Sequence, residues 1–114
     1  MQRVPLNVRL KSLTELLEVV LGEVNDIRAR HRLGPALVDL PEGSMGAFGC
    51  CPIARALTGG PFWAEVTEGY VTVFRPGGDG LGPVVVEHRE LVADAQEFVH
   101  RFDHGHLPAY VDPA

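Results

Sequence analysis

The chain has 114 residues, of which 46% are hydrophobic, and its formal net charge is −5. This length and composition support one small domain with an ordinary core, which argues against disorder along the whole chain. The acidic balance argues against a phosphate-binding surface, so nucleic acid is not expected as a partner.

The first predicted element is a helix over residues 12 to 32, which follows a short flexible or extended arm over residues 1 to 9. Ser12 and Glu15 have the spacing of an N-terminal capping box, and apolar residues then recur at helical intervals. Gly34 and Pro35 follow as a stop signal. Arginines cluster near the end of this helix. Three arrangements are compatible with this cluster: internal ion pairs, solvated helix ends, and head-to-tail contact between copies of the chain.

A heptad-like pattern of apolar residues runs along this helix. Its members recur at steps of three and four, the spacing of a coiled-coil seam: Leu10, Leu13, Leu17, Val20, Val24 and Ile27. Leu16, Val19 and Leu21 widen the apolar surface beyond a narrow stripe, as in a helix buried in the core of its own domain. Burial in the core is therefore the first interpretation, and an oligomer face made of the six seam residues is the alternative.

The middle of the chain is predicted to contain a long loop and a short helix. Residues 34 to 49 are rich in residues that favour turns, and we expect a loop there. Within this loop, residues 36 to 38 are predicted to form a short strand or one helical turn. Pro52 stands at a first helical position, and Gly59 with Gly60 ends the segment. This pattern predicts a helix of about two turns.

A β-hairpin is predicted next, because residues 62 to 67 and 70 to 74 are rich in aromatic and β-branched side chains on either side of Gly69. A glycine-rich loop over residues 76 to 83 leads to a third strand over residues 84 to 86, which we expect to be buried on both faces. An amphipathic helix follows over residues 89 to 103 and is ended by Gly105 and Pro108. The expected fold class is α+β, with a long N-terminal helix, a short second helix, an antiparallel sheet of two or three strands and an amphipathic C-terminal helix.

One face of the predicted hairpin is a candidate binding surface. Strand alternation places Trp63 on the face opposite the small apolar residues of its strand. If the register brings Trp63 together with Tyr70, Thr72 and Phe74, this face is aromatic with scattered polar groups, as binding surfaces are. The alternative is that a helix covers the face, in which case these four residues belong to the core.

Two adjacent cysteines, Cys50 and Cys51, precede the short helix. The dipole and the free amides of a helix N-terminus lower the pKa of a nearby thiol, so either cysteine is a candidate nucleophile or redox sensor. The alternative is burial in the core, because free cysteine is among the most buried residues and no C-x-x-C motif is present. Adjacent cysteines also cannot join distant segments, which argues against a disulfide framework.

Three histidines, His100, His104 and His106, lie near the end of the last predicted helix. The first two are one helical turn apart, a spacing at which two imidazoles can share a metal ion. His106 lies beyond Gly105, however, and histidine is already favoured at a helix C-terminus by the dipole. The alternative to a metal site is therefore a solvated helix end.

No family motif, serine-hydrolase motif or phosphate-loop motif matches this sequence. No apolar run is long enough to span a membrane, and no signal-peptide pattern is found, so we expect a cytoplasmic protein without a membrane partner. We predict a small non-catalytic interaction or regulatory module that binds a protein partner or self-associates and needs no cofactor. The alternatives are a thiol-dependent enzyme or redox sensor, and a metal- or ligand-binding protein whose pocket lies between the sheet and the glycine-rich loops.

Overall fold

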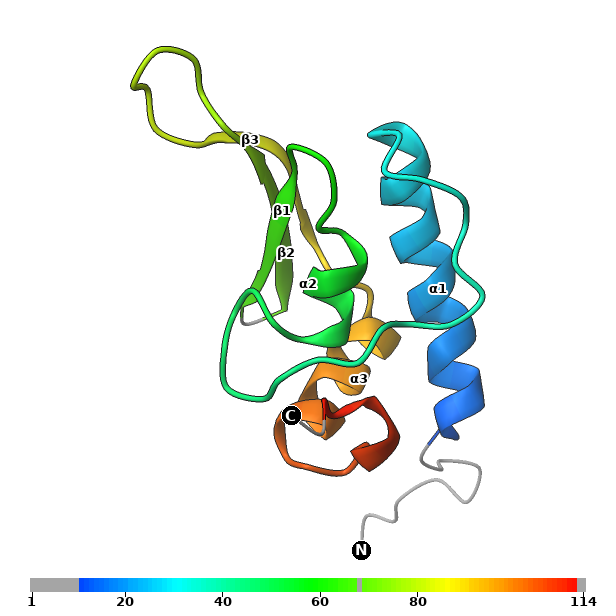
Figure 1. Ribbon diagram of the computed structural model, residues 1–114. Helices are drawn as coiled ribbons and strands as arrows, with labels where there is room; N and C mark the ends of the chain where they lie inside the picture. The colour runs from blue at the N-terminus through cyan, green and yellow to red at the C-terminus, as the bar shows by residue number, and fades with distance from the viewer. Residues whose placement is uncertain (1–10, 68, 113–114) are drawn as a thin grey trace, which may run out of the picture.

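The computed structural model describes residues 11–67 and 69–112, and it has the α+β fold that the sequence predicts. Figure 1 shows α1 and α2 on one side of the sheet and the 76–83 loop projecting away from α3. In chain order the elements are α1 (Leu13–Arg30), α2 (Pro52–Ala56), β1 (Trp63–Thr67), β2 (Tyr70–Arg75), β3 (Val84–Glu90), α3 (Ala93–Asp103) and a 3₁₀ turn (Pro108–Tyr110). The predicted arm over residues 1 to 9 lies outside the described residues.

The long helix α1 begins at the predicted capping box. The Ser12 hydroxyl accepts a hydrogen bond from the Glu15 amide at 3.2 Å, and the Glu15 carboxylate accepts one from the Ser12 amide at 2.8 Å. These two bonds satisfy amide groups that have no partner within the first turn of a helix. The helix ends at Arg30 with His31 as its C-cap, two residues earlier than the sequence predicts.

The sheet is antiparallel throughout, with the strand order β1-β2-β3. Trp63 pairs with Phe74 and Thr67 pairs with Tyr70, so the hairpin register is the one that brings the aromatic residues onto one face. Gly69 in the turn between β1 and β2 has a φ of 86°, a left-handed conformation that glycine adopts without strain. Strands β2 and β3 also pair, with a shift in register between Val73 and Phe74.

The boundary between the third strand and the last helix differs from the prediction. Strand β3 continues to Glu90, and α3 begins only at Ala93. Residues 87 to 90 pair with residues 70 to 73 of β2, and this pairing outweighs the helical periodicity of the local sequence. Val85 is 53% exposed, so the expectation that this strand is buried on both faces is wrong.

The core lies between the inner face of the sheet and the helices. Ala64, Val66, Val71 and Val73 alternate along β1 and β2 and are all buried. The large side chains that are almost fully buried with them come from the three helices and the C-cap of α2: Leu16, Val20, Val24, Ile27, Ile53, Leu57, Phe98 and Phe102. Strands β1 and β2 are therefore apolar on the side of the helices, as strand alternation requires.

The seam of apolar residues on α1 is used inside this core. Val20, Val24 and Ile27 are at most 2% exposed, and Leu13 and Leu17 are half-buried against the same cluster. Side chains buried in this way cannot contact a second copy of the chain, so the oligomer-face alternative is wrong for the three buried residues. Leu10 lies outside the described residues.

Charged side chains join α1 to β3. Glu87 of β3 accepts hydrogen bonds from Arg30, from His31 at 2.9 Å and from Arg89 at 3.1 Å. Arg89 also pairs with Asp26 at 3.2 Å. Arg30 therefore forms an internal ion pair, which is one of the three arrangements considered for the arginine-rich end of this helix.

A separate observation concerns membranes. Within the described ranges, no helix has the combination of length and apolar character that is needed to cross a bilayer.

Candidate functional site

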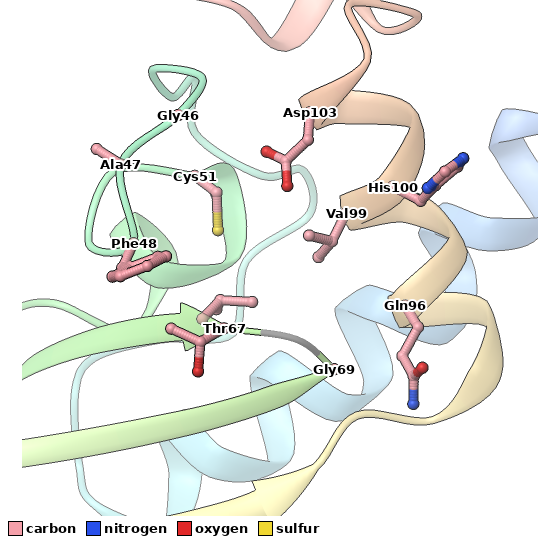
Figure 2. Close-up of a pocket in the computed structure, with 11 residues that line it drawn as sticks. Gly46, Ala47, Phe48, Cys51, Thr67, Gly69, Gln96, Val99, His100 and Asp103 are labelled. Carbon is pink, nitrogen blue, oxygen red and sulfur yellow. The ribbon is translucent and has the colours of Figure 1, made fainter.

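A cavity of about 470 Å³ lies between the 46–48 loop, the end of β1 and the outward side of α3 (Figure 2). Pockets of roughly 300 to 1,000 Å³ are the usual size of small-ligand sites. Polar groups line this cavity from three different segments of the chain: Cys51, Thr67, Gln96, His100 and Asp103. Apolar surface comes from Ala47, Phe48, Val66 and Val99.

The 46–48 loop is held in place by backbone and side-chain hydrogen bonds. The Phe48 carbonyl accepts a hydrogen bond from the Val66 amide at 2.9 Å, which fixes the loop to the outer edge of β1. At the base of the loop, the Ser44 amide donates to the Cys50 carbonyl at 2.7 Å, and the Ser44 hydroxyl accepts from Arg55 at 3.2 Å. The cavity therefore has a defined wall on this side, although Phe48 itself is 65% exposed.

Cys51 contributes its sulfur to the cavity wall. It is the N-cap of α2, and its Sγ accepts a weak hydrogen bond from the Ala54 amide at 3.5 Å. Burial raises the pKa of the Cys51 thiol, because desolvation outweighs the amide hydrogen bonds and the Asp103 carboxylate adds to the rise. The amides at the helix N-terminus lower the pKa of this thiol as expected, but the larger effect of burial reverses the net direction.

The geometry does not assemble a thiol-imidazole pair. Figure 2 shows the Cys51 sulfur directed into the cavity, whereas the His100 imidazole points away from it. No hydrogen bond joins a cysteine to a histidine within the part of the chain that the structure describes. A thiolate nucleophile needs an adjacent base or a positive charge that stabilises it. Among the described residues, Cys51 has neither. Cys50 is partly exposed and forms no disulfide; its side chain interacts with the Arg55 guanidinium and lies outside the cavity lining.

The three candidate metal ligands lie near one another but do not form a site. The ring centroids of His100 and His104 are 4.3 Å apart, and those of His104 and His106 are 6.2 Å apart. Among residues 11–67 and 69–112, no group of three or more metal-ligating side chains can hold an ion. Helix α3 ends at Asp103, and Gly105 turns the chain with a φ of 76°, so His106 departs from the helix face that His100 and His104 share.

The outer face of the sheet is a second candidate site. Trp63 and Phe74 stack with their ring centroids 5.5 Å apart, and both rings are partly exposed. Tyr70, which is 41% exposed, stacks on His88 of β3 at 5.2 Å, and the Thr72 hydroxyl lies 2.9 Å from the Nδ1 of His88. None of these residues belongs to the core cluster.

Sequence reasoning missed His88 in this group. The sequence predicts that the third strand ends at residue 86, which places His88 in the connection to the last helix. The signal that identifies His88 is the alternation of side chains along residues 87 to 90 of the strand. Glu87 and Arg89 point toward α1, whereas His88 and Glu90 lie on the outer face.

Asp103 is a further polar residue of the cavity that the sequence analysis does not identify. In the structure it faces the cavity from the last turn of α3, and Figure 2 shows its carboxylate directed toward the space beside Val99. An acidic residue in the last turn of a helix is disfavoured by the helix dipole, and that is the sequence signal that points to it.

Comparisons with known proteins do not assign either site. The chain matches no protein-family model, no curated protein and no solved structure. The cavity and the outer sheet face are therefore the two features of this structure from which a function can be inferred.

Proposed function

We propose that this chain is a small non-catalytic interaction module that binds a basic segment of a protein partner on the outer face of its sheet. The observation that carries the proposal is the pair of stacked ring systems on that face, Trp63 with Phe74 and Tyr70 with His88. Aromatic residues are enriched at the centres of protein interfaces, because they bury a large area with few rotatable bonds.

The rings on this face are held in position before a partner arrives. The Trp63 and Phe74 planes are inclined by only 19°, and those of Tyr70 and His88 by 4°. The contact between His88 and the Thr72 hydroxyl further fixes the second stack. Side chains that are already ordered lose little conformational entropy on binding, so more of the contact energy contributes to affinity.

The charge of the face indicates the chemistry of the partner. By strand alternation and register, Glu65 and Glu90 lie on the same face as the ring stacks. No cation pairs with either carboxylate in the described part of the chain. Carboxylates beside aromatic faces suit arginine and lysine side chains, which make ion pairs and cation–π contacts.

A separate partner suits this face better than a second copy does. The net charge of −5 makes two copies repel one another, and Arg30 is already paired with Glu87.

We place the interaction in the cytoplasm, where the free thiols of Cys50 and Cys51 remain reduced.

The single tryptophan of the chain allows a direct test. Trp63 fluorescence is recorded while an extended peptide of alternating arginine and valine is added, and a peptide of alternating glutamate and valine serves as the control ligand. We expect a saturable change with the arginine peptide only. A double variant, Glu65→Gln with Glu90→Gln, should weaken that binding at least about tenfold, which corresponds to the loss of exposed ion pairs on both sides of the rings.

A matched variant distinguishes the effect of the carboxylates on the outer face from the effect of the overall charge. Glu18→Gln with Asp79→Asn removes the same charge from exposed positions elsewhere and should leave the affinity unchanged. Equal weakening in both double variants would mean that the peptide responds only to net charge, and the proposal would then fail. Loss of the stack in Phe74→Ser should weaken the binding of the arginine peptide, with thermal unfolding recorded to confirm that the variant is folded.

A further inference from the structure

The cavity beside Cys51 and Asp103 is not part of the outer sheet face and needs its own explanation. Val66, Val99 and the exposed Phe48 ring give its lining apolar surface, and Figure 2 shows Phe48 on the side of the 46–48 loop and Val99 on α3. A cavity with apolar walls and few polar groups is the usual form of a small-ligand site.

Asp103 gives this cavity its charge. Its carboxylate forms no hydrogen bond or ion pair within the described ranges, and Figure 2 shows it directed toward the cavity. Asp103 is also the last residue of α3, where the helix dipole places a partial negative charge. The carboxylate and the helix end therefore both disfavour an anion and favour a cation.

The other polar groups add no compensating positive charge. Burial raises the pKa of the Cys51 thiol, so the thiol stays protonated and adds no second negative charge to the cavity. Thr67 offers a hydroxyl, and the Gln96 amide is already engaged as a donor to the Leu91 carbonyl at 2.7 Å. His100 lines the rim, but its imidazole is turned away from the cavity and contacts His104.

We propose that this cavity binds a small organic ammonium ion, with the charged nitrogen at Asp103 and the apolar body against Val66, Val99 and Phe48. The carboxylate accepts a charge-assisted hydrogen bond from the ammonium group. The exposed Phe48 ring contributes apolar contact to the body of the ligand. This site is separate from the outer sheet face, and its ligand is a small molecule rather than a protein segment.

The probe for the test is 2-phenylethylammonium, which carries one ammonium group on an apolar body. Two ligands of similar size serve as controls: 2-phenylethanol, which is neutral, and 3-phenylpropionate, which is an anion. Amide NMR spectra of the full chain are recorded during each titration. We expect saturable shifts only with the ammonium ion, and we expect them at Cys51, Thr67, Val99 and Asp103.

The decisive variant is Asp103→Asn, which keeps the shape of the side chain and removes its charge. It should weaken the binding of 2-phenylethylammonium about three- to fivefold, because Asp103 is exposed and an ion pair to an exposed carboxylate contributes at most about 1 kcal/mol. Asp79→Asn is the matched control, because it removes the same charge from an exposed loop position and should leave the affinity unchanged. Thermal unfolding confirms that both variants are folded.

Three results would overturn the proposal. The first is binding of 2-phenylethanol as tightly as the ammonium ion, and the second is an unchanged affinity in Asp103→Asn. The third is tighter binding of a short lysine-containing peptide at the same residues, which would assign the cavity to a protein partner. The Glu65→Gln, Glu90→Gln variant must bind 2-phenylethylammonium normally, so the cavity and the outer sheet face are tested independently.

Discussion

His31 and Glu87 are 56 residues apart in the sequence, yet the His31 Nε2 lies 2.9 Å from a carboxylate oxygen of Glu87. Glu87 also accepts hydrogen bonds from Arg30 and Arg89, and its side chain is only 12% exposed. One carboxylate thus joins the C-terminal end of α1 to β3, one of the two edge strands of the sheet.

Replacing Glu87 by glutamine should destabilise the fold. The variant leaves Arg30 and Arg89 without their shared carboxylate at a mostly buried position, and we expect the free energy of unfolding to fall by about 1 to 3 kcal/mol. Urea denaturation measures this change. Asp26→Asn removes a partner of Arg89 that is 57% exposed, and it should cost less than about 1 kcal/mol. Equal costs in the two variants would show that burial of Glu87 does not matter.

Two glycines should respond to alanine in opposite directions. At Gly43 a Cβ atom would lie 2.7 Å from the Pro52 nitrogen and 2.8 Å from the Cys51 carbonyl carbon, so Gly43→Ala should destabilise the fold by about 3 kcal/mol. Gly22 lies in α1 with nothing near its missing Cβ, and Gly22→Ala should stabilise the fold by about 0.5 to 1 kcal/mol. Thermal or urea unfolding reports both signs, and a stable Gly43→Ala protein would contradict the close packing of this loop.

Tyr110 should make stability depend on pH in the alkaline range. Its hydroxyl donates a 2.7 Å hydrogen bond to Asp39, and burial together with that carboxylate raises the pKa of Tyr110 to about 12. The folded state therefore favours the neutral phenol. This contribution is complete below the pKa of about 10 in the unfolded chain and is lost as the pH rises toward 12.

The variant Tyr110→Phe tests this dependence. At neutral pH it lacks the hydrogen bond to Asp39 and should be less stable than the wild type by about 1 kcal/mol. Above pH 10 the stabilities of the two proteins should converge, because only the wild type has a buried phenol to ionise. Tyr70→Phe changes an exposed phenol and should keep the wild-type dependence. Parallel curves for Tyr110→Phe and the wild type would contradict the prediction.

The two cysteines should differ in their reaction with iodoacetamide. Cys51 is 5% exposed and burial raises the pKa of its thiol, so the Cys50→Ser variant, which retains Cys51, should react slowly until the protein is unfolded. The Cys51→Ser variant retains the partly exposed Cys50 and should react at least about tenfold faster. Mass spectrometry follows both reactions. Rapid modification of Cys51 in the folded protein would revive the thiol-enzyme alternative.

Local sequence was sufficient for the helices that have complete end signals. Ser12 and Glu15 form the predicted capping box, and Pro52 begins α2 as expected. Each of these signals acts over only a few residues, so no distant part of the chain has to be known. The composition of the aromatic outer face also follows from the sequence, because alternation along a strand assigns side chains to faces once the hairpin register is set.

Pairing between distant segments decided the remaining features. Residues 87 to 90 form a strand because β2 offers them hydrogen-bond partners, and this extension brings His88 to the outer face and Glu87 to α1. The cavity depends on the approach of the 46–48 loop to α3, and no local pattern encodes that approach. The raised pKa of Cys51 follows from the same packing, because desolvation depends on what surrounds the thiol in space rather than on its neighbours in sequence.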